Sequence, residues 1–350
     1  MRDVAVVAFV QSHHTAEDQG LAETEIVLPV ITEIKERTGL SRFGFTCSGS
    51  CDYLQGAPFA FVSALDTLGA WPPISESHVE MDGAWALYEA WVKLQIGAID
   101  TALVYGFGKS SQGDLRAIMN QQLDPYTLAP LGVDQVSMAA MQARAYMDKA
   151  GVKEDDLRAV AARSRAAGRE NPFALHLPDP EGSADEQDYD VAPLHPYDVA
   201  PITDGAAAIV LAAGDKAREL CERPAWITGI DHRTEPHALG VRDLTRSEAA
   251  RIAGERAGAA GVEIAELHAQ FSHEELILRE ALGLGDGVAV NPSGGALSAN
   301  PVMAAGLIRI GEAASRIHDG TASRTLGHAA SGPCLQQNLV CVMSGEKNNG

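Results

Sequence analysis

Five polar side chains in the sequence could move protons or hold a negatively charged oxygen. They are Glu80, Asp82, His268, Asn300 and His328, and each falls at a predicted loop end. A histidine, or a carboxylate with a raised pKa, can transfer protons near pH 7, and an asparagine amide can donate to an oxyanion. Buried polar groups cost free energy unless they are paired or used, so this set favours a chemical role.

Each of these residues also has a structural interpretation. Asp82 lies two residues before the start of a predicted helix at 84–96, and aspartate is a good N-cap. Glu80 could pair with a nearby base, His268 could be a satisfied buried histidine, and His328 could be purely structural. The sequence leaves both interpretations open for each residue.

A second set of residues is predicted to contact a ligand. Two consecutive glycines lie in the loop Val290–Pro301, where a missing Cβ permits a positive φ and close ligand approach. Cys334 could instead be a small buried hydrophobic residue, and His78 could cap a loop or form a hydrogen bond with it. The set is Ser293, Gly294, Gly295, Cys334 and His78.

Length and charge exclude several classes of protein. A chain of 350 residues is too long for one simple core and indicates two units of similar size. The formal net charge of -20 argues against nucleic acids and anionic membrane surfaces as partners. No apolar run is long enough to predict a transmembrane helix, and residues 2–10 are typical of a buried strand rather than of a targeting signal.

The cysteines predict reduced thiols and no metal site. There are five, an odd number, in a long chain without a recognisable signal, which favours a cytoplasmic location. Cys47 and Cys51 have no second pair with which to bind structural zinc. The segment Gly106–Lys109 departs from the phosphate-loop pattern, which argues against ATP binding.

Strand and helix patterns alternate in both halves of the chain. This alternation predicts the α/β class, with mostly parallel sheets covered by helices on both faces. Residues 71–82 are expected to form a loop. The expected strands are 4–10, 43–47, 100–106, 225–230, 265–269, 324–328 and 338–343, and the expected helices are 22–38, 54–68, 84–96, 135–149, 246–260, 273–281 and 301–317.

Residues 107–200 interrupt the alternation. They contain the predicted helix 135–149 and an acidic, proline-rich stretch at 177–190, which we expect to be a solvated or partner-facing loop. We therefore predict an N-terminal half at 1–215 that includes this insertion, and a C-terminal half at 216–350.

Four motifs resemble those of the thiolase superfamily, in matching order along almost the whole chain. Asn291–Pro301 resembles the active-site loop N-x-x-G-G-A-x-x-x-H-P, with Asn300 in place of the histidine. The others are a DGAAA strand at Ile202–Leu211, a loop at Glu266–Phe271 similar to E-[LI]-[HN]-x-A-F, and a glycine-rich turn at Thr325–Pro333 where thiolases carry a second cysteine.

Two further segments, Ser75–Asp82 and Asp124–Thr127, are similar to the sterol-carrier-protein-like branch, in particular to lipid-transfer protein subunits of actinobacterial steroid catabolism. This resemblance implies the thiolase fold, with two similar βαβαβαββ halves stacked in five layers (α-β-α-β-α). It also implies a steroid side-chain aldolase subunit that cleaves a β-hydroxyacyl-CoA by retro-aldol chemistry. Coenzyme A would then enter as part of the substrate, with no separate cofactor.

The resemblance also indicates what has been lost. Thiolases carry a nucleophilic cysteine at the start of the helix that corresponds to 84–96, but residues 79–84 contain none, so no covalent acyl-enzyme is expected. His328 aligns with the second thiolase cysteine, which makes it the leading acid/base candidate, followed by Asp82. Asn300 and backbone N–H groups near Gly295 are the expected oxyanion donors.

Three interpretations stay open at this point. The chain could be an aldolase subunit, an auxiliary or non-catalytic thiolase-fold subunit, or an acyl-CoA or lipid-binding protein without chemistry, because a fold does not settle function. By resemblance, we expect a dimer or higher oligomer, with a second thiolase-like chain or an OB-fold acyl-CoA-associated subunit as the partner.

Overall fold

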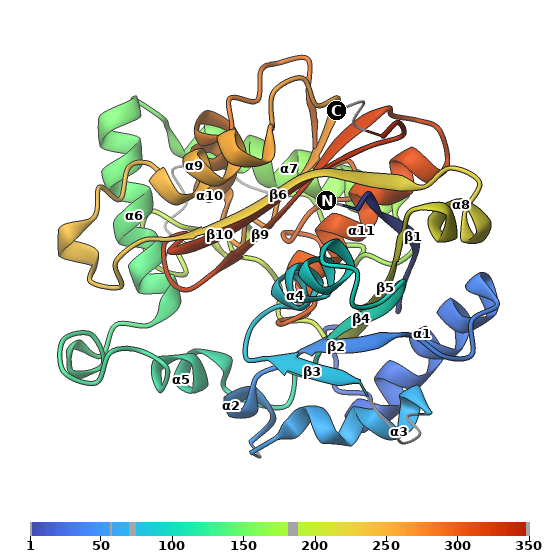
Figure 1. The fold of residues 1–350 in the computed structure, drawn as a ribbon. Helices are drawn as coiled ribbons and strands as arrows, with labels where there is room; N and C mark the ends of the chain where they lie inside the picture. Colours follow the sequence, from blue (N-terminus) through green and yellow to red (C-terminus); the bar gives the residue numbers. More distant parts are fainter. Residues whose placement is uncertain (1, 57, 70–74, 181–187, 348–350) are drawn as a thin grey trace.

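Ten strands form one mixed sheet that consists of two sets of five. The computed structural model describes residues 2–56, 58–69, 75–180 and 188–347. The first set has the order β3-β2-β4-β5-β1 and the second β6-β10-β9-β7-β8 (Figure 1). The strands are β1 (Val4–Gln11), β2 (Phe45–Gly49), β3 (Glu76–Val79), β4 (Thr101–Gly108), β5 (Gly205–Ala213), β6 (Ala225–Thr234), β7 (Ile264–Glu266), β8 (Ala289–Val290), β9 (Arg324–Ser331) and β10 (Gln337–Ser344).

The two sets repeat one pairing pattern. In each, the second strand pairs in parallel with the third and fourth, and the fifth pairs antiparallel with the fourth and the first. The sets are joined edge to edge by β1 and β6, through the residue pairs Ala5 with Trp226 and Val6 with Ala225. The predicted boundary at residues 215 and 216 falls where α8 begins, and it stays a prediction.

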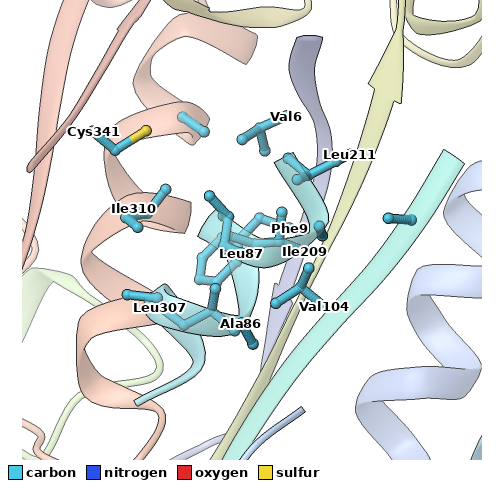
Figure 2. Packing of buried hydrophobic residues seen from close by; sticks show 14 of the residues in the cluster. Val6, Phe9, Ala86, Leu87, Val104, Ile209, Leu211, Leu307, Ile310 and Cys341 are labelled. Carbon is cyan, nitrogen blue, oxygen red and sulfur yellow. The ribbon is translucent and has the colours of Figure 1, made fainter. Parts of the chain in front are cut away.

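The side chains of β1 assign the layers. Val4, Val6 and Phe9 point into a central core that also includes residues of β9 and β10, whereas Ala5 and Val10 point into an outer core against α1. Successive residues of a strand face opposite sides, and a bulge between Val6 and Ala8 shifts the alternation. Figure 2 shows the central core, in which residues of both halves meet.

Two helices fill the central layer, and further helices cover the outer faces. α4 (Gly83–Gln95) and α11 (Ala305–His318) lie between the sets of strands, α1 (Glu23–Thr38) and α3 (Leu65–Leu68) cover the first set, and α9 (Glu248–Ala257) and α10 (Ser272–Ala281) cover the second (Figure 1). The expected α/β fold with two similar halves in five layers is confirmed. The expectation of mostly parallel sheets is wrong, because five of the nine strand pairs among the described residues are antiparallel. The other α-helices are α2 (Asp52–Gln55), α5 (Leu115–Asn120), α6 (Gln135–Ala150), α7 (Glu154–Glu170) and α8 (Asp215–Leu220).

Some elements differ from the sequence-based expectation. The single helix expected at 54–68 is wrong: α2 ends at Gln55, Phe59 has a positive φ of 57° after Pro58, and a 3-10 turn precedes α3. Proline in the helix interior removes a hydrogen bond and clashes with the preceding turn. The expected loop 71–82 contains β3, and its residues 71–74 lie outside the described residues.

The insertion is mostly helical and packs on the C-terminal half. α6 and α7 contact α10 through an apolar cluster that includes Val136, Ala143, Leu157 and Phe271. Residues 181–187 of the expected acidic loop lie outside the described residues. Among the helices that the structure describes, none is long and apolar enough to cross a bilayer.

Candidate active site

A cavity of about 270 Å³ opens where parallel strands of both halves end. Its wall includes Cys51 after β2, Glu80 to Asp82 after β3, His268 and Gln270 after β7, and residues 330–333 after β9. Ligand sites of α/β sheets form at such carboxyl ends of strands. Four of the five predicted proton-transfer or oxyanion residues therefore line one cavity: Glu80, Asp82, His268 and Asn300.

His268 is held as a neutral hydrogen-bond donor. Its Nδ1 accepts from the Ala330 N–H at 3.3 Å, so the ring proton sits on Nε2, which lies 3.3 Å from the Asn300 Oδ1. Burial, with the charge of Arg309 adding to it, lowers the pKa of His268 to about 4. At neutral pH this imidazole donates a hydrogen bond and has no free lone pair with which to act as a base.

Asn300 places its amide in the same cavity. Its backbone N–H donates to the Thr203 Oγ1 at 3.0 Å, and its Oδ1 lies against His268, so the amide nitrogen is the group turned to a ligand. An amide N–H donor that is held in place in this way can stabilise a carbonyl oxygen that becomes negative during a reaction. This is the role that the sequence predicted for Asn300, and it stays a prediction.

Asp82 is a cap shared by two helices. Its Oδ1 accepts from the backbone N–H groups of Ala84 and Leu307, both at 2.9 Å, and its Oδ2 accepts from Gly306 at 2.8 Å. The carboxylate thus binds the first turns of α4 and α11 together, where negative charge is favourable. Burial raises the pKa of Asp82, and the three N–H donors oppose that effect. The geometry supports the capping interpretation rather than proton transfer.

Glu80 lies at the exposed rim of the cavity. Both of its carboxylate oxygens accept from the Asp52 N–H at 3.1 Å, at the first turn of α2. Burial of part of the side chain raises the pKa of Glu80. His78 lies on β3 and stacks on Phe61 with ring centroids 3.8 Å apart, and it is not part of the cavity wall.

His328 does not line the cavity. It is fully buried, and its Nε2 lies 3.0 Å from the Asn338 Oδ1 on the neighbouring strand β10. On β9 it shares a face with Leu326 and Ala330, which belong to the outer apolar core. Burial lowers the pKa of His328 to about 3, so the ring is neutral. The geometry does not support direct acid/base contact between His328 and a ligand.

The glycine loop is built for packing rather than for ligand contact. Gly294 has a φ of +98° and Gly295 a φ of +64°, and an added Cβ would lie 2.8 Å from the Gly168 Cα or the Asn291 side chain, respectively. The Gly295 N–H faces the Ser293 Oγ at 3.4 Å, so the expected backbone oxyanion donors near Gly295 have partners within the loop. None of the three loop residues predicted to bind a ligand lines the cavity.

Ser293 instead belongs to a buried ion-pair cluster. Its Oγ donates to the Glu266 Oε2 at 2.6 Å and accepts from the Arg309 Nη1, also at 2.6 Å. Glu266 and Arg309 form an ion pair at 3.1 Å with side-chain exposures of 0% and 3%. A buried charge pair of this kind is stable only when its remaining donors and acceptors are satisfied.

The thiols near the site are protonated. Cys334 is buried beside the cavity without lining it, and burial raises its pKa to about 12. Cys51 lines the cavity, accepts from the Gln122 amide at 3.2 Å, and its pKa is also raised by burial. A thiol acts as a nucleophile only as the thiolate. The sequence analysis expected no nucleophilic cysteine at the start of α4. The N-cap of α4 is Asp82 and its first residue is Gly83.

Two groups of cavity-lining residues were missed by the sequence analysis. Glu274 and Gln270 line the cavity, but in the sequence they resemble an ordinary polar start of α10. The insertion provides a largely apolar wall, which its amphipathic pattern alone did not place at the site. The apolar members of that wall are Leu115, Met119, Leu123, Leu128 and Met138.

No family model matches the chain, but several curated relatives do. The acetyl-CoA acetyltransferase of Methanocaldococcus jannaschii is 28% identical over 278 residues, 69% of this chain and 70% of the relative. Human sterol carrier protein 2 is 25% identical over 73% of this chain and 54% of its own length. A steroid side-chain-cleaving aldolase of Thermomonospora curvata is 32% identical over 36% of this chain and 32% of its own.

Solved structures match the chain from end to end. The human mitochondrial 3-ketoacyl-CoA thiolase superposes with a TM-score of 0.75 at 14% identity, over 98% of this chain and 99% of the thiolase. The chain has the thiolase fold. A structure described as an Ltp2-ChsH2(DUF35) aldolase superposes with a TM-score of 0.80 at 19% identity, over 99% and 98% of the two chains.

The expected resemblance to the sterol-carrier-protein-like branch of thiolase-fold proteins is confirmed. The names of these distant relatives, which are aldolases, carriers and thiolases, point to a lyase or thiolase-like role. Among the described residues, no group of three or more histidine, cysteine or acidic side chains is placed to hold a metal ion.

Proposed function

We propose that this thiolase-fold chain is a carbon–carbon lyase that cleaves a β-hydroxyacyl-CoA, of the steroid side-chain type, by a retro-aldol reaction. The observation that carries the proposal is the pair His268 and Asn300, in which the neutral imidazole donates to the Asn300 Oδ1 and turns the amide N–H into a cavity whose cysteine is protonated. In this reaction the Cα–Cβ bond breaks, its electron pair moves onto Cα and the thioester oxygen, and the β-carbon becomes a carbonyl. The Asn300 amide N–H would hold the enolate oxygen, and His268, whose single N–H donates to the Asn300 Oδ1, would hold that amide in place.

The charge of the cavity wall suggests which part of the substrate it takes. Among the described residues of the wall there is no lysine or arginine, whereas Glu80, Asp82, Asp124 and Glu274 are acidic. Phosphate groups are unfavourable in such surroundings. We therefore expect the cavity to hold the acyl end and the thioester, while the nucleotide of coenzyme A stays outside.

A partner chain belongs to the proposal. The name of the Ltp2-ChsH2(DUF35) aldolase joins two components, and that structure matches this chain over nearly its whole length. We therefore expect a second thiolase-like chain or an acyl-CoA-associated subunit to bind this protein too. At about 270 Å³ the cavity is just below the usual range for drug-sized ligands of about 300–1,000 Å³. A steroid would therefore extend beyond it, toward the insertion or a partner surface.

The test is direct. The chain is incubated with a β-hydroxy steroid side-chain CoA ester, with and without co-expressed neighbouring subunits, and the short acyl-CoA and carbonyl products are followed by mass spectrometry. We expect cleavage, and a loss of about 100-fold or more in Asn300→Ala, because one oxyanion donor is worth about 10²–10³ in rate. His268→Ala should also lower the rate, because it removes the donor that orients the Asn300 amide. Tight binding of the ester without cleavage under any pairing would favour an auxiliary or carrier role instead.

A further inference from the structure

The cavity contains one buried carboxyl group that is bound only by backbone N–H groups at the start of its own helix. Glu274 lies in the first turn of α10, is 4% exposed, and lines the same cavity as His268 and Asn300. Its Oε2 accepts from the backbone N–H of Gln270 at 2.9 Å. Among the described residues it forms no ion pair with a lysine or arginine.

The adjacent glutamate is a natural comparison. Glu275 is equally buried, but its carboxylate is saturated by an ion pair with Arg163 and by the Asn291 amide at 2.9 Å. A buried carboxylate without a cation is costly unless it is protonated or used. Of the two neighbours, one is fully paired inside the fold, and the other faces the cavity with only backbone donors.

The remaining polar groups of the cavity are already engaged. His268 has its Nδ1 occupied and presents a proton at Nε2, so it cannot accept one there. Asp82 is bound by three backbone N–H groups, and Glu80 is exposed and bound to Asp52. Asp124 is partly exposed and accepts from the backbone N–H groups of the two residues that follow Pro125. His237 also lies on the wall, but its side chain is 60% exposed and faces Asp124 at 3.7 Å. Among the buried groups of the wall, Glu274 is therefore the one available to exchange a proton with a ligand.

We propose that Glu274 is the proton carrier of the cavity. This inference rests on the proposed lyase function. The Glu274 carboxylate takes the proton of the β-hydroxyl group as the Cα–Cβ bond breaks, which leaves a carbonyl product and an enolate of the acyl-CoA. The neutral carboxyl then returns that proton to Cα, which gives the short acyl-CoA and restores the carboxylate. The two steps balance without any oxidant or reductant.

The electrostatics fit this role. Burial raises the pKa of Glu274 to about 8, and the N–H groups of Gln270 and Phe271 oppose the rise. A general base or acid works best when its pKa lies near the working pH. The titratable neighbours are His268 and His273, neutral with pKa values lowered to about 4 and about 3, and the Cys334 thiol, which faces Arg242 and has a pKa raised to about 12. None of these titrates between pH 6 and 9.

The experiment measures exchange of the α-hydrogens of acetyl-CoA in D2O by mass spectrometry, on the full chain. We expect wild-type exchange to increase from pH 6 to about 8 and then level off, because the carboxylate is the active form. Glu274→Gln should lose about 100-fold or more of the exchange rate, in line with a typical general-base contribution. Glu274→Asp should retain part of it, and Glu36→Gln, which alters an exposed glutamate on α1, should match the wild type.

Several outcomes would overturn the inference. Wild-type exchange in Glu274→Gln, or no exchange in the wild type despite bound acetyl-CoA, would each do so. Far-UV circular dichroism shows whether each variant folds, and equilibrium dialysis shows whether it binds acetyl-CoA. If Glu274→Gln does not fold or bind, the exchange rate of Glu274→Asp is compared with the wild type instead. Failure of the lyase proposal looks different: exchange would persist and depend on Glu274, while no β-hydroxyacyl-CoA is cleaved.

Discussion

Asp82 joins the two halves of the protein, and its removal should destabilise both at once. In Asp82→Ala, three buried backbone N–H groups of Ala84, Gly306 and Leu307 lose their acceptor. Loss of an N-cap costs about 1 kcal/mol, and a buried donor left without a partner costs about 1–3 kcal/mol. We therefore expect a loss of about 3–5 kcal/mol in the free energy of unfolding, which corresponds to a fall in Tm of about 5 °C or more.

The matched control is Asp114→Ala. Asp114 is also an N-cap aspartate, but it is exposed and binds a single N–H, that of Ala117 at 3.1 Å. Its loss should cost about 1 kcal/mol or less. Thermal and urea unfolding of both variants, followed by far-UV circular dichroism, give the comparison. If Asp82→Ala unfolds within about 1 °C of Asp114→Ala, the carboxylate does not hold α4 and α11 together and the reasoning is wrong.

Three further predictions concern the cavity and its neighbours. Glu274→Gln should raise Tm relative to the wild type by at least about 3 °C at pH 8.5 but not at pH 5, because a folded-state pKa of about 8 makes the wild type lose stability as pH increases from about 4.5 to 8. A pH-independent difference in Tm would contradict this. Cys51→Ser should retain turnover within about threefold, because no thiolate takes part. Loss of turnover in a folded Cys51→Ser variant would indicate a covalent mechanism through this cysteine. His328→Ala should lower Tm, because it leaves a cavity and an Asn338 Oδ1 without a partner, yet retain turnover per folded molecule. A loss of turnover in a folded His328→Ala variant would instead indicate that His328 takes part in catalysis.

Periodicity predicted most elements of the fold because the buried faces are continuous. Helix α4 was expected at 84–96 and spans Gly83–Gln95, and α11 was expected at 301–317 and spans Ala305–His318. Both contain apolar residues around much of their circumference, since they lie between two sheets. The break at Pro58 was missed because the apolar pattern continues across it, although the proline itself was a signal against a single helix.

The residues of the site were harder to predict than the elements of the fold, because which residues of a strand line the cavity depends on how far along the strand the cavity extends. His328 was expected at a catalytic position from the resemblance to thiolases, but it does not line the cavity. Ala330, two residues further on the same face of β9, does. Sequence alternation assigns the face of a strand and not this depth. Glu274 shows the opposite case: its sequence indicates only a helix start, and the wall that buries it includes Met138 and Leu335, which are remote in the chain.

The position of β5 between β4 and β1 delays the pairing of β1 while the protein is made on the ribosome. β1 is made first, but its partners are β5 and β6, about 200 residues later, and the whole insertion must emerge before either. At about 5–20 residues per second, the first strand waits about 10–40 s for its neighbours. During that interval the apolar strand Val4–Gln11 is exposed as an unpaired edge. A nascent chain of this protein is therefore a natural client for a chaperone that shields its first strand until residue 213 has left the tunnel.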